Sequence, residues 1–262
     1  MRISHVGRLA ILVAGLFTGA AHGEMVQLRV TVENLAPMDS VAFAPLRFGV
    51  HAGNYDSFNN GEAASAAIIS IAEGGSGSDW FPAFMAAEPS ANFGSALPNP
   101  AGPLLPGGTG TTILTVDTAV NRYFTFASMV VPSNDYFIGN DSPMQYLLFD
   151  ENGQLNLTEI RQQASDIWDA GSELDDPANA AFLQIGDNSL RTPQGGVVNF
   201  NFAGLDIFNG LTTAAGYSFD SQLTADQEVY RISFEVVPEP STVVLLGLSG
   251  VGALALLHRR RR

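Results

Sequence analysis

The 262-residue sequence contains neither cysteine nor lysine. Without cysteine the chain can form no disulfide, no thiolate nucleophile and no cysteine-based zinc or iron–sulfur site. Without lysine it offers no Schiff base and no P-loop lysine for phosphate. Positive charge is also scarce, because twelve arginines face 26 aspartates and glutamates, a formal net charge of −14. These absences exclude many familiar classes of enzyme.

The few arginines are concentrated at the two ends of the chain. Arg2 and Arg8 lie near the start and residues 259–262 are all arginine, which leaves six between them. All 26 acidic residues fall within residues 24–239, so this segment carries 6 − 26 = −20. Nucleic acid binding requires clustered lysine or arginine, and we expect no DNA or RNA partner. Cations are the partners that this charge favours.

The first 23 residues have the layout of a secretory signal peptide. A basic start is followed by an apolar run at residues 9–17 and by small residues that end in Ala21-His22-Gly23, an A-x-G-like cleavage site. The run is shorter than the ~20 residues of a membrane-spanning helix, which favours export over a permanent anchor. We predict that residues 1–23 are removed.

The C-terminus combines a short motif with an apolar run. Pro238, Glu239 and Pro240 precede a run at residues 243–257 that is apolar except for Ser249, and four arginines end the chain. At ~1.5 Å per residue the run can span a ~30 Å hydrocarbon core if the arginines snorkel, so we expect a transmembrane helix. The arginines should hold this end in the cytoplasm, which places everything before Pro238 outside.

This order of motif, apolar helix and arginine cluster resembles the PEP-CTERM sorting signal of Gram-negative bacteria. The resemblance implies that residues 238–262 are recognised by an exosortase, a membrane protease-transpeptidase. The exosortase would cleave near Pro238-Glu239-Pro240 and release or transfer the protein to the cell surface. The chain would then be anchored in the inner membrane only transiently, with its C-terminus in the cytoplasm. A permanent single-pass anchor is the alternative.

Residues 24–237 are predicted to form one mainly β domain, an antiparallel sandwich. Apolar and polar residues alternate over residues 26–32 and 230–236, which is typical of strands with one solvated face. Runs of β-branched and aromatic residues predict further strands at residues 41–50, 111–118, 123–131, 144–149 and 196–202.

Two segments within this domain favour helices in loops between strands. Residues 61–73 are rich in helix formers and end at Gly74-Gly75, and residues 158–168 begin with a possible N-cap, Thr158. Proline and glycine at residues 98–110 predict a surface loop. Four phenylalanines in the predicted strands are expected in the core: Phe124, Phe126, Phe200 and Phe202.

His51 is the only histidine that remains once both ends are removed. A two-histidine metal site is therefore excluded, and the apolar run around His51 favours a packed, hydrogen-bonded histidine over a catalytic one. Acidic residues are abundant, so a carboxylate pair that hydrolyses polysaccharide stays open as an alternative. We expect that the protein is not an enzyme.

Two stretches contain acidic residues that are candidate cation ligands. Asp135 lies in a polar turn after Pro132, and five carboxylates lie close together further on: Asp166, Asp169, Glu173, Asp175 and Asp176. Carboxylates and backbone carbonyls on a loop are hard oxygen ligands of the kind that calcium takes, whereas zinc prefers nitrogen or sulfur. By composition alone, a solvated acidic loop is the more common case.

Met129-Val-Val-Pro-Ser-Asn-Asp135 and Trp168-Asp-Ala-Gly-Ser-Glu173 resemble segments of the spondin N-terminal domain, found in F-spondin and many secreted bacterial proteins. The resemblance spans about residues 25–237. It implies a β-sandwich related to C2 domains and a calcium ion held by Asp135, Asp169 and Glu173. The turn and the loop both depart from the family pattern: the turn reads Ser-Asn-Asp-Tyr instead of Ser-Pro-Asp-Trp, and the last acid of the loop is glutamate instead of aspartate. These departures affect the expected calcium affinity rather than the type of metal, because the ligands are still oxygen atoms. We interpret Asp175 and Asp176 as a solvated turn rather than as additional ligands.

The resulting expectation is an exported, calcium-binding protein that serves adhesion or a biofilm matrix and is sorted to the surface by an exosortase. An exopolysaccharide or another extracellular ligand is the expected second partner. A calcium-dependent carbohydrate- or lipid-binding module is the first alternative, and an extracellular polysaccharide hydrolase is the second.

Overall fold

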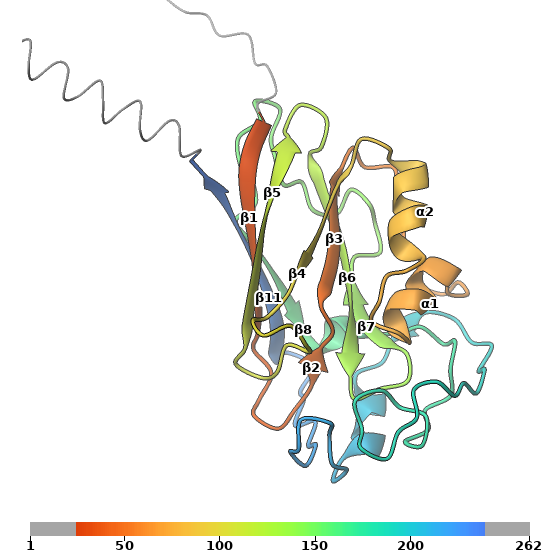
Figure 1. The fold of residues 1–262 in the computed structure, drawn as a ribbon. Coiled ribbons are helices and arrows are strands. Elements are labelled where there is room, and N and C mark those ends of the chain that lie inside the picture. Colours follow the sequence, from red (N-terminus) through yellow and green to blue (C-terminus); the bar gives the residue numbers. More distant parts are fainter. Residues whose placement is uncertain (1–24, 239–262) are drawn as a thin grey trace, which may run out of the picture.

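The computed structural model describes residues 25–238, which form two antiparallel β-sheets and a few short helices (Figure 1). The mainly β, antiparallel fold predicted from the sequence is confirmed. The predicted signal peptide, Glu239, Pro240 and the predicted transmembrane run at residues 243–257 lie outside the described residues. Between residues 25 and 238, no helix has the length and hydropathy needed to cross a membrane.

The smaller sheet has four strands in the order β5-β1-β11-β8. Its two central strands place Leu28 opposite Val236 and Val32 opposite Ile232. Side chains along the first of them alternate between buried and partly exposed, because one face of the sheet meets the core and the other meets water. The predicted alternation is therefore confirmed. The strands are β1 (Met25–Asn34), β5 (Thr109–Asp117), β8 (Glu159–Gln163) and β11 (Glu228–Val237).

The larger sheet has seven strands, six of them in the order β10-β9-β7-β6-β3-β4, with β2 paired to β6. All pairs in both sheets are antiparallel. The strands are β2 (Ala42–Phe43), β3 (Leu46–His51), β4 (Asn92–Ala96), β6 (Tyr123–Val131), β7 (Tyr136–Gly139), β9 (Trp168–Asp169) and β10 (Asn199–Phe200).

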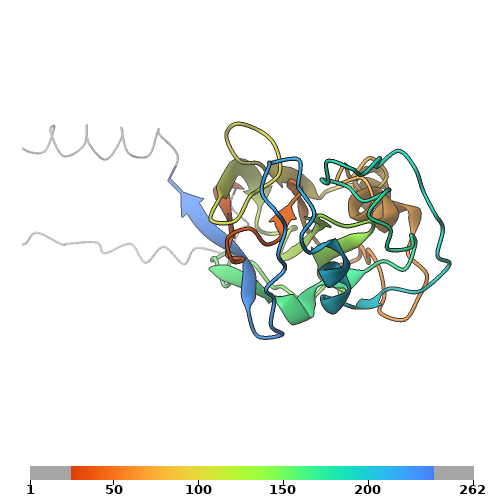
Figure 2. The same ribbon diagram turned by 90° about the horizontal axis from the view of Figure 1, so that it is seen from below.

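The main hydrophobic core lies between the two sheets. Phe124 of β6 meets Phe234 of β11 edge-to-face with ring centroids 4.8 Å apart, and Phe43 meets Tyr230 at 4.6 Å. Both contacts join one sheet to the other, as the two layers seen from below in Figure 2 indicate. Burial of such aromatic side chains is the main favourable contribution to folding.

Helices α1 (Ala66–Ala72) and α2 (Trp80–Ala87) cover the outer face of the larger sheet (Figure 1). Trp80 and Phe84 belong to a second apolar cluster that also contains Ala127 of β6 and Phe137 of β7. Strand β6 is therefore buried on both faces, which explains why its sequence is apolar without alternation.

The predicted helix at residues 61–73 is confirmed in shortened form. Ser65 caps the N-terminus of α1, since its side chain accepts a hydrogen bond from the Ile68 amide. Helix α2 was not predicted from the sequence, although Pro82 in its first turn occupies a position where no backbone amide partner is needed.

The predicted helix at residues 158–168 is wrong. Residues 159–163 form β8, a short 3₁₀ helix follows at Ala164–Asp166, and β9 begins at Trp168. Ile160 faces Ile232 in the ladder between β8 and β11. Pairing with an adjacent strand outweighs helix propensity, which is worth less than 1 kcal/mol per residue.

Two predicted strands are also largely absent from the described chain. Residues 144–149 form only the isolated bridges Tyr123 to Leu147 and Phe149 to Leu155. The segment 196–202 contains only the two residues of β10. Phe200 was predicted in the core, but its side chain is 51 % exposed, whereas Phe124 and Phe126 are fully buried as predicted. The predicted loop at residues 98–110 is confirmed up to the start of β5.

Gly94→Ala is expected to destabilise the protein, because a Cβ on this residue of β4 would lie 2.3 Å from the ring of Phe48. Overpacking of this kind costs about 1–3 kcal/mol of unfolding free energy. Gly102→Ala is the matched control, since a Cβ there meets no atom within 4 Å. Urea denaturation should show a lower midpoint for Gly94→Ala only, and equal midpoints for the two variants would contradict this packing.

Candidate metal centre

Antiparallel pairing of β7 and β9 brings the two predicted acidic stretches together. Tyr136 lies opposite Asp169 in this ladder, and the Ala170 amide donates to the Asp135 carbonyl at 3.2 Å. The turn before β7 and the loop after β9 therefore meet at one end of the larger sheet. Long-range strand pairing, rather than local sequence, creates the site.

Asp135 is 1 % exposed and accepts three hydrogen bonds at one oxygen. Its Oδ2 accepts from the Ser172 amide at 2.7 Å, the Ser172 hydroxyl at 3.0 Å and the Glu173 amide at 2.9 Å. Its Oδ1 is buried without a hydrogen-bond partner among the described residues. Burial, together with the negative charge of Asp169, outweighs these hydrogen bonds and raises the pKa of Asp135 to about 7.

Asp169 is buried beside Asp135 and is held by two donors. Its Oδ1 accepts from the Gly171 amide at 2.7 Å and its Oδ2 accepts from the Asn201 side chain at 3.1 Å. Gly171 has a φ of +65°, and a Cβ there would meet the Val197 backbone at 2.6 Å. Glycine is therefore required at this turn.

Glu173 contributes its amide to Asp135 but directs its carboxylate elsewhere. Its Oε1 accepts from Asn134 at 3.1 Å, and its Oε2 lies 3.5 Å from Nε of Arg191. The same guanidinium pairs with Glu73, just beyond α1, at 2.6 Å. The Glu173 side chain is thus buried between an amide and a shared arginine. Burial raises its pKa, and both neighbours oppose that rise.

The interpretation of Asp175 as part of a solvated turn is wrong. Its Oδ2 accepts from the Tyr136 hydroxyl at 2.9 Å, and its Oδ1 is buried without a hydrogen-bond partner in the described part of the chain. Burial and the charge of Asp169 raise the pKa of Asp175 to about 6, although the Tyr136 hydrogen bond opposes this. Asp176 does form a turn, with its Oδ1 accepting from the Ala178 amide at 2.9 Å.

Tyr136 lies at the centre of this acidic cluster, which we define as Asp135, Asp169 and Asp175. Its hydroxyl pKa is raised first by burial and then by the charges of all three carboxylates. Asn201 donates to the same hydroxyl at 2.9 Å. Sequence reasoning missed Tyr136 and Asn201, because neither is a calcium-type acid and Asn201 joins the site from beyond β10.

The oxygen donors of the acidic cluster are those that a hard cation prefers, but its side chains do not form a complete coordination shell. Within residues 25–238, no group of three or more histidines, aspartates and glutamates is placed to hold a metal ion. The three predicted ligands, Asp135, Asp169 and Glu173, come together as neighbours, with the Glu173 carboxylate turned toward Arg191.

His51 is buried and hydrogen-bonded, as predicted. Its Nε2 lies 2.9 Å from the Thr125 hydroxyl and its Nδ1 accepts from the Gly53 amide at 3.0 Å. Glu88 lies 3.4 Å from Nδ1, but burial dominates and lowers the pKa of His51. This geometry describes a neutral histidine within the packing of β3.

A family model of the PEP-CTERM protein-sorting motif matches residues 236–262. The match includes Pro238, Glu239 and Pro240 and confirms the sorting signal predicted from the sequence. This signal implies export and sorting to the cell surface by an exosortase, which is a membrane protein. A comparison with curated proteins finds no match to the chain.

Proposed function

We propose that the protein is a calcium-binding adhesion or biofilm-matrix protein without catalytic activity, carried to the surface by its sorting signal. We further propose that residues 24–237 are a spondin-type, C2-like sandwich. The observation that supports the calcium site is the burial of two carboxylate oxygens, Oδ1 of Asp135 and Oδ1 of Asp175, which have no hydrogen-bond partner within residues 25–238 and lie beside Asp169.

The donors at this site suit calcium better than zinc. The available donors are carboxylate, hydroxyl and amide oxygens, which are hard ligands, whereas structural zinc takes thiolate or imidazole. A divalent cation would neutralise the repulsion between Asp135 and Asp169 and would coordinate the buried oxygens. The carboxylates do not form a complete coordination shell in the described structure. The proposal therefore requires that their side chains change conformation when the ion binds.

Two ligand sets are possible, and they differ in the last acid. The family resemblance points to Asp135, Asp169 and Glu173, but Glu173 would have to leave Arg191 to reach the ion. Asp175 already lies near Asp169 and Tyr136. We therefore propose Asp135, Asp169 and Asp175 as the primary ligands, with Glu173 completing the set if its carboxylate turns.

Calcium titration of the full-length chain by isothermal calorimetry tests this proposal. Asp169→Asn and Asp175→Asn should each weaken calcium binding at least tenfold, because each removes a charged oxygen ligand. Glu173→Gln should weaken it much less if Asp175 is the third ligand. Asp176→Asn is the matched control, since its Oδ1 serves only the Ala178 amide and asparagine keeps that acceptor.

Equal calcium binding by all four variants would contradict the site, and absence of binding by the wild type would contradict the metal. In cells, the adhesive role predicts that Asp169→Asn reduces surface attachment while the amount of surface protein stays constant. Attachment equal to that of the wild type would separate calcium binding from adhesion.

A further inference from the structure

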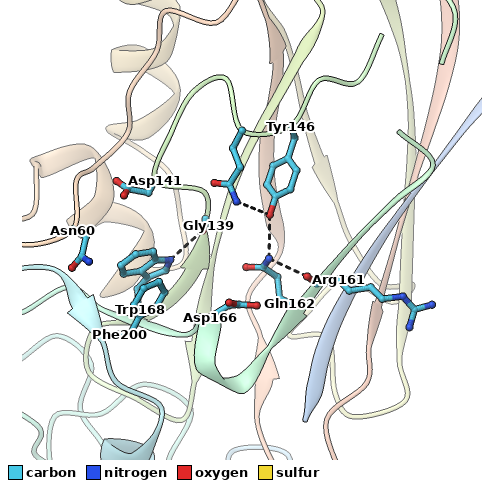
Figure 3. A pocket seen from close by; sticks show the side chains of 10 residues that line it. Asn60, Gly139, Asp141, Tyr146, Arg161, Gln162, Asp166, Trp168 and Phe200 are labelled. Carbon is cyan, nitrogen blue, oxygen red and sulfur yellow. Dashed lines mark hydrogen bonds between the residues drawn. The ribbon is translucent and has the colours of Figure 1, made fainter. Parts of the chain in front are cut away.

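A polar pocket of about 280 Å³ is lined by Trp168 of β9 and Phe200 of β10 (Figure 3). Adjacent residues of a strand point to opposite faces, so Asp169 faces the acidic cluster while Trp168 lines the pocket. Asn60, Asp141 and Gln162 line it as well, from elements far apart in the sequence. Its volume is at the lower end of the range for small-molecule sites, which is suited to a single sugar ring.

One wall of the pocket is a stacked aromatic pair. Trp168 and Phe200 face each other across the β9–β10 ladder with centroids 3.6 Å apart and an interplanar angle of 25°. Trp168 is 4 % exposed and is fixed by a hydrogen bond from its indole nitrogen to the Gly139 carbonyl at 3.1 Å. Phe200 is half exposed, and one face of its ring packs on Trp168. Its exposed face is a flat apolar surface on which the C–H face of a sugar ring can stack.

The other walls carry hydrogen-bonding groups in fixed positions. The Tyr146 hydroxyl accepts from the amides of Gln145 at 3.1 Å and Gln162 at 3.4 Å, which orients both side chains (Figure 3). Oδ1 of Asp141 is buried without a hydrogen-bond partner in the described chain. Because leaving a buried carboxylate oxygen unpaired is costly, a turn of the Asp141 side chain that brings Oδ1 to a ligand hydroxyl would be favourable.

The charge of the pocket selects against anions. Asp141 and Asp166 contribute two carboxylates. The guanidinium of Arg161 points away from the pocket in Figure 3. It pairs instead with Glu159 at 2.8 Å and with Glu228 at 2.5 Å. A ligand with neutral hydroxyl donors fits this environment, whereas a uronic acid or phosphate would be repelled.

We propose that this pocket binds a neutral pyranose unit of an extracellular polysaccharide, stacked on Phe200 and hydrogen-bonded to Asp141. The inference rests on the proposed role in adhesion or matrix assembly, for which it names the ligand class. It does not rest on calcium, because none of the residues of the acidic cluster lines the pocket.

Tryptophan fluorescence of the full-length chain can test this binding. The sequence has two tryptophans. Trp80 of α2 is fully buried and does not line the pocket, so Trp168 is the one that reports on it. The probes are the methyl glycosides of glucose, galactose, mannose, N-acetylglucosamine and glucuronic acid, in a detergent without a sugar headgroup. At least one neutral glycoside should give a saturable signal, and the glucuronide should bind more weakly.

Phe200→Ala and Asp141→Asn should each weaken binding of that glycoside about tenfold. Ile113→Ala is the control for exposed apolar surface, since Ile113 is 50 % exposed on β5 of the other sheet. EDTA and Asp176→Asn, the control variant of the calcium titration, should leave sugar binding by the pocket itself unchanged. A flat calcium titration with intact sugar binding would thus refute the metal proposal alone.

Three results would overturn the inference: no saturable signal with any neutral glycoside, wild-type affinity in Phe200→Ala, or tighter binding of the glucuronide. If the wild type binds calcium normally in the same preparation, such a result refutes the sugar site and leaves the metal site standing.

Discussion

Asp135→Asn is expected to stabilise the metal-free protein at pH 8 and to abolish the stabilisation by calcium. The wild-type carboxylate must ionise in a buried site whose environment raises its pKa from 3.8 to about 7. This difference corresponds to a cost on the order of 4 kcal/mol at pH well above 7. Asparagine keeps one acceptor oxygen for the Ser172 and Glu173 amides and places an NH₂ group where Oδ1 has no partner.

The same substitution should change the pH dependence of stability. Because the folded-state pKa of Asp135 is raised, its contribution to stability is fully present below pH 3.8 and is lost as pH rises through about 7. Asp175 adds a smaller effect of the same sign around pH 6. In EDTA, the unfolding free energy of the wild type should therefore fall between pH 5 and pH 8.

Urea denaturation at several pH values, with EDTA or with calcium, measures these effects. Calcium should restore most of the stability of the wild type at pH 8, since it binds the folded state and stabilises by mass action. Asp176→Asn should behave as the wild type does. General repulsion among the acidic residues also lowers stability at higher pH, so the comparison between Asp135→Asn and the control isolates the buried group. Identical pH slopes in these two variants would contradict the raised pKa.

The sequence predicted the two central strands of the smaller sheet better than its edge strand β8. Strands β1 and β11 have one wet face, and their alternation is visible in the residues alone. Strand β8 also alternates, with Ile160 and Gln162 buried, but its polar, helix-forming residues made a helix the stronger prediction. Only pairing with β11, some 65 residues later in the chain, determines its conformation.

The candidate metal centre could be predicted only in part, for a similar reason. The resemblance to spondin domains identified Asp135 and Asp169, which the β7–β9 ladder brings together. Asp175 was misinterpreted, because its burial depends on the hydroxyl of Tyr136, 39 residues away. Phe200 was misplaced in the core because strand periodicity does not show that β10 is the last strand of its sheet, where one side chain can face a pocket.

The described chain begins and ends on neighbouring strands of the smaller sheet (Figure 1). Gln27 near the start of β1 pairs with Val237 at the end of β11. The ladder continues to Val237, and Pro238 ends it because proline has no amide to donate. The sorting motif therefore begins immediately at the edge of the folded chain, without an intervening linker.

Replacing Pro238, Glu239 and Pro240 together by alanine is expected to block processing and to retain the uncleaved chain in the membrane fraction. Two prolines around one residue favour an extended backbone, the form in which proteases bind substrates, whereas alanines would allow the helix predicted for residues 243–257 to extend toward β11. Mass spectrometry of the C-terminus in membrane, surface and supernatant fractions measures the outcome.

Glu235→Ala is the matched control for this experiment, because it removes an exposed acid from the same chain end and costs only the surface ion pair with Arg29. This variant should be cleaved like the wild type. A chain with eight glycine and serine residues inserted after Val237 should also be cleaved, since the domain and its ladder to β1 stay intact. If the triple alanine variant matured to the wild-type mass, the exosortase would have to recognise the apolar run and the arginines instead of the motif. If only the inserted chain failed, recognition would extend to the edge of the folded domain, where β11 ends.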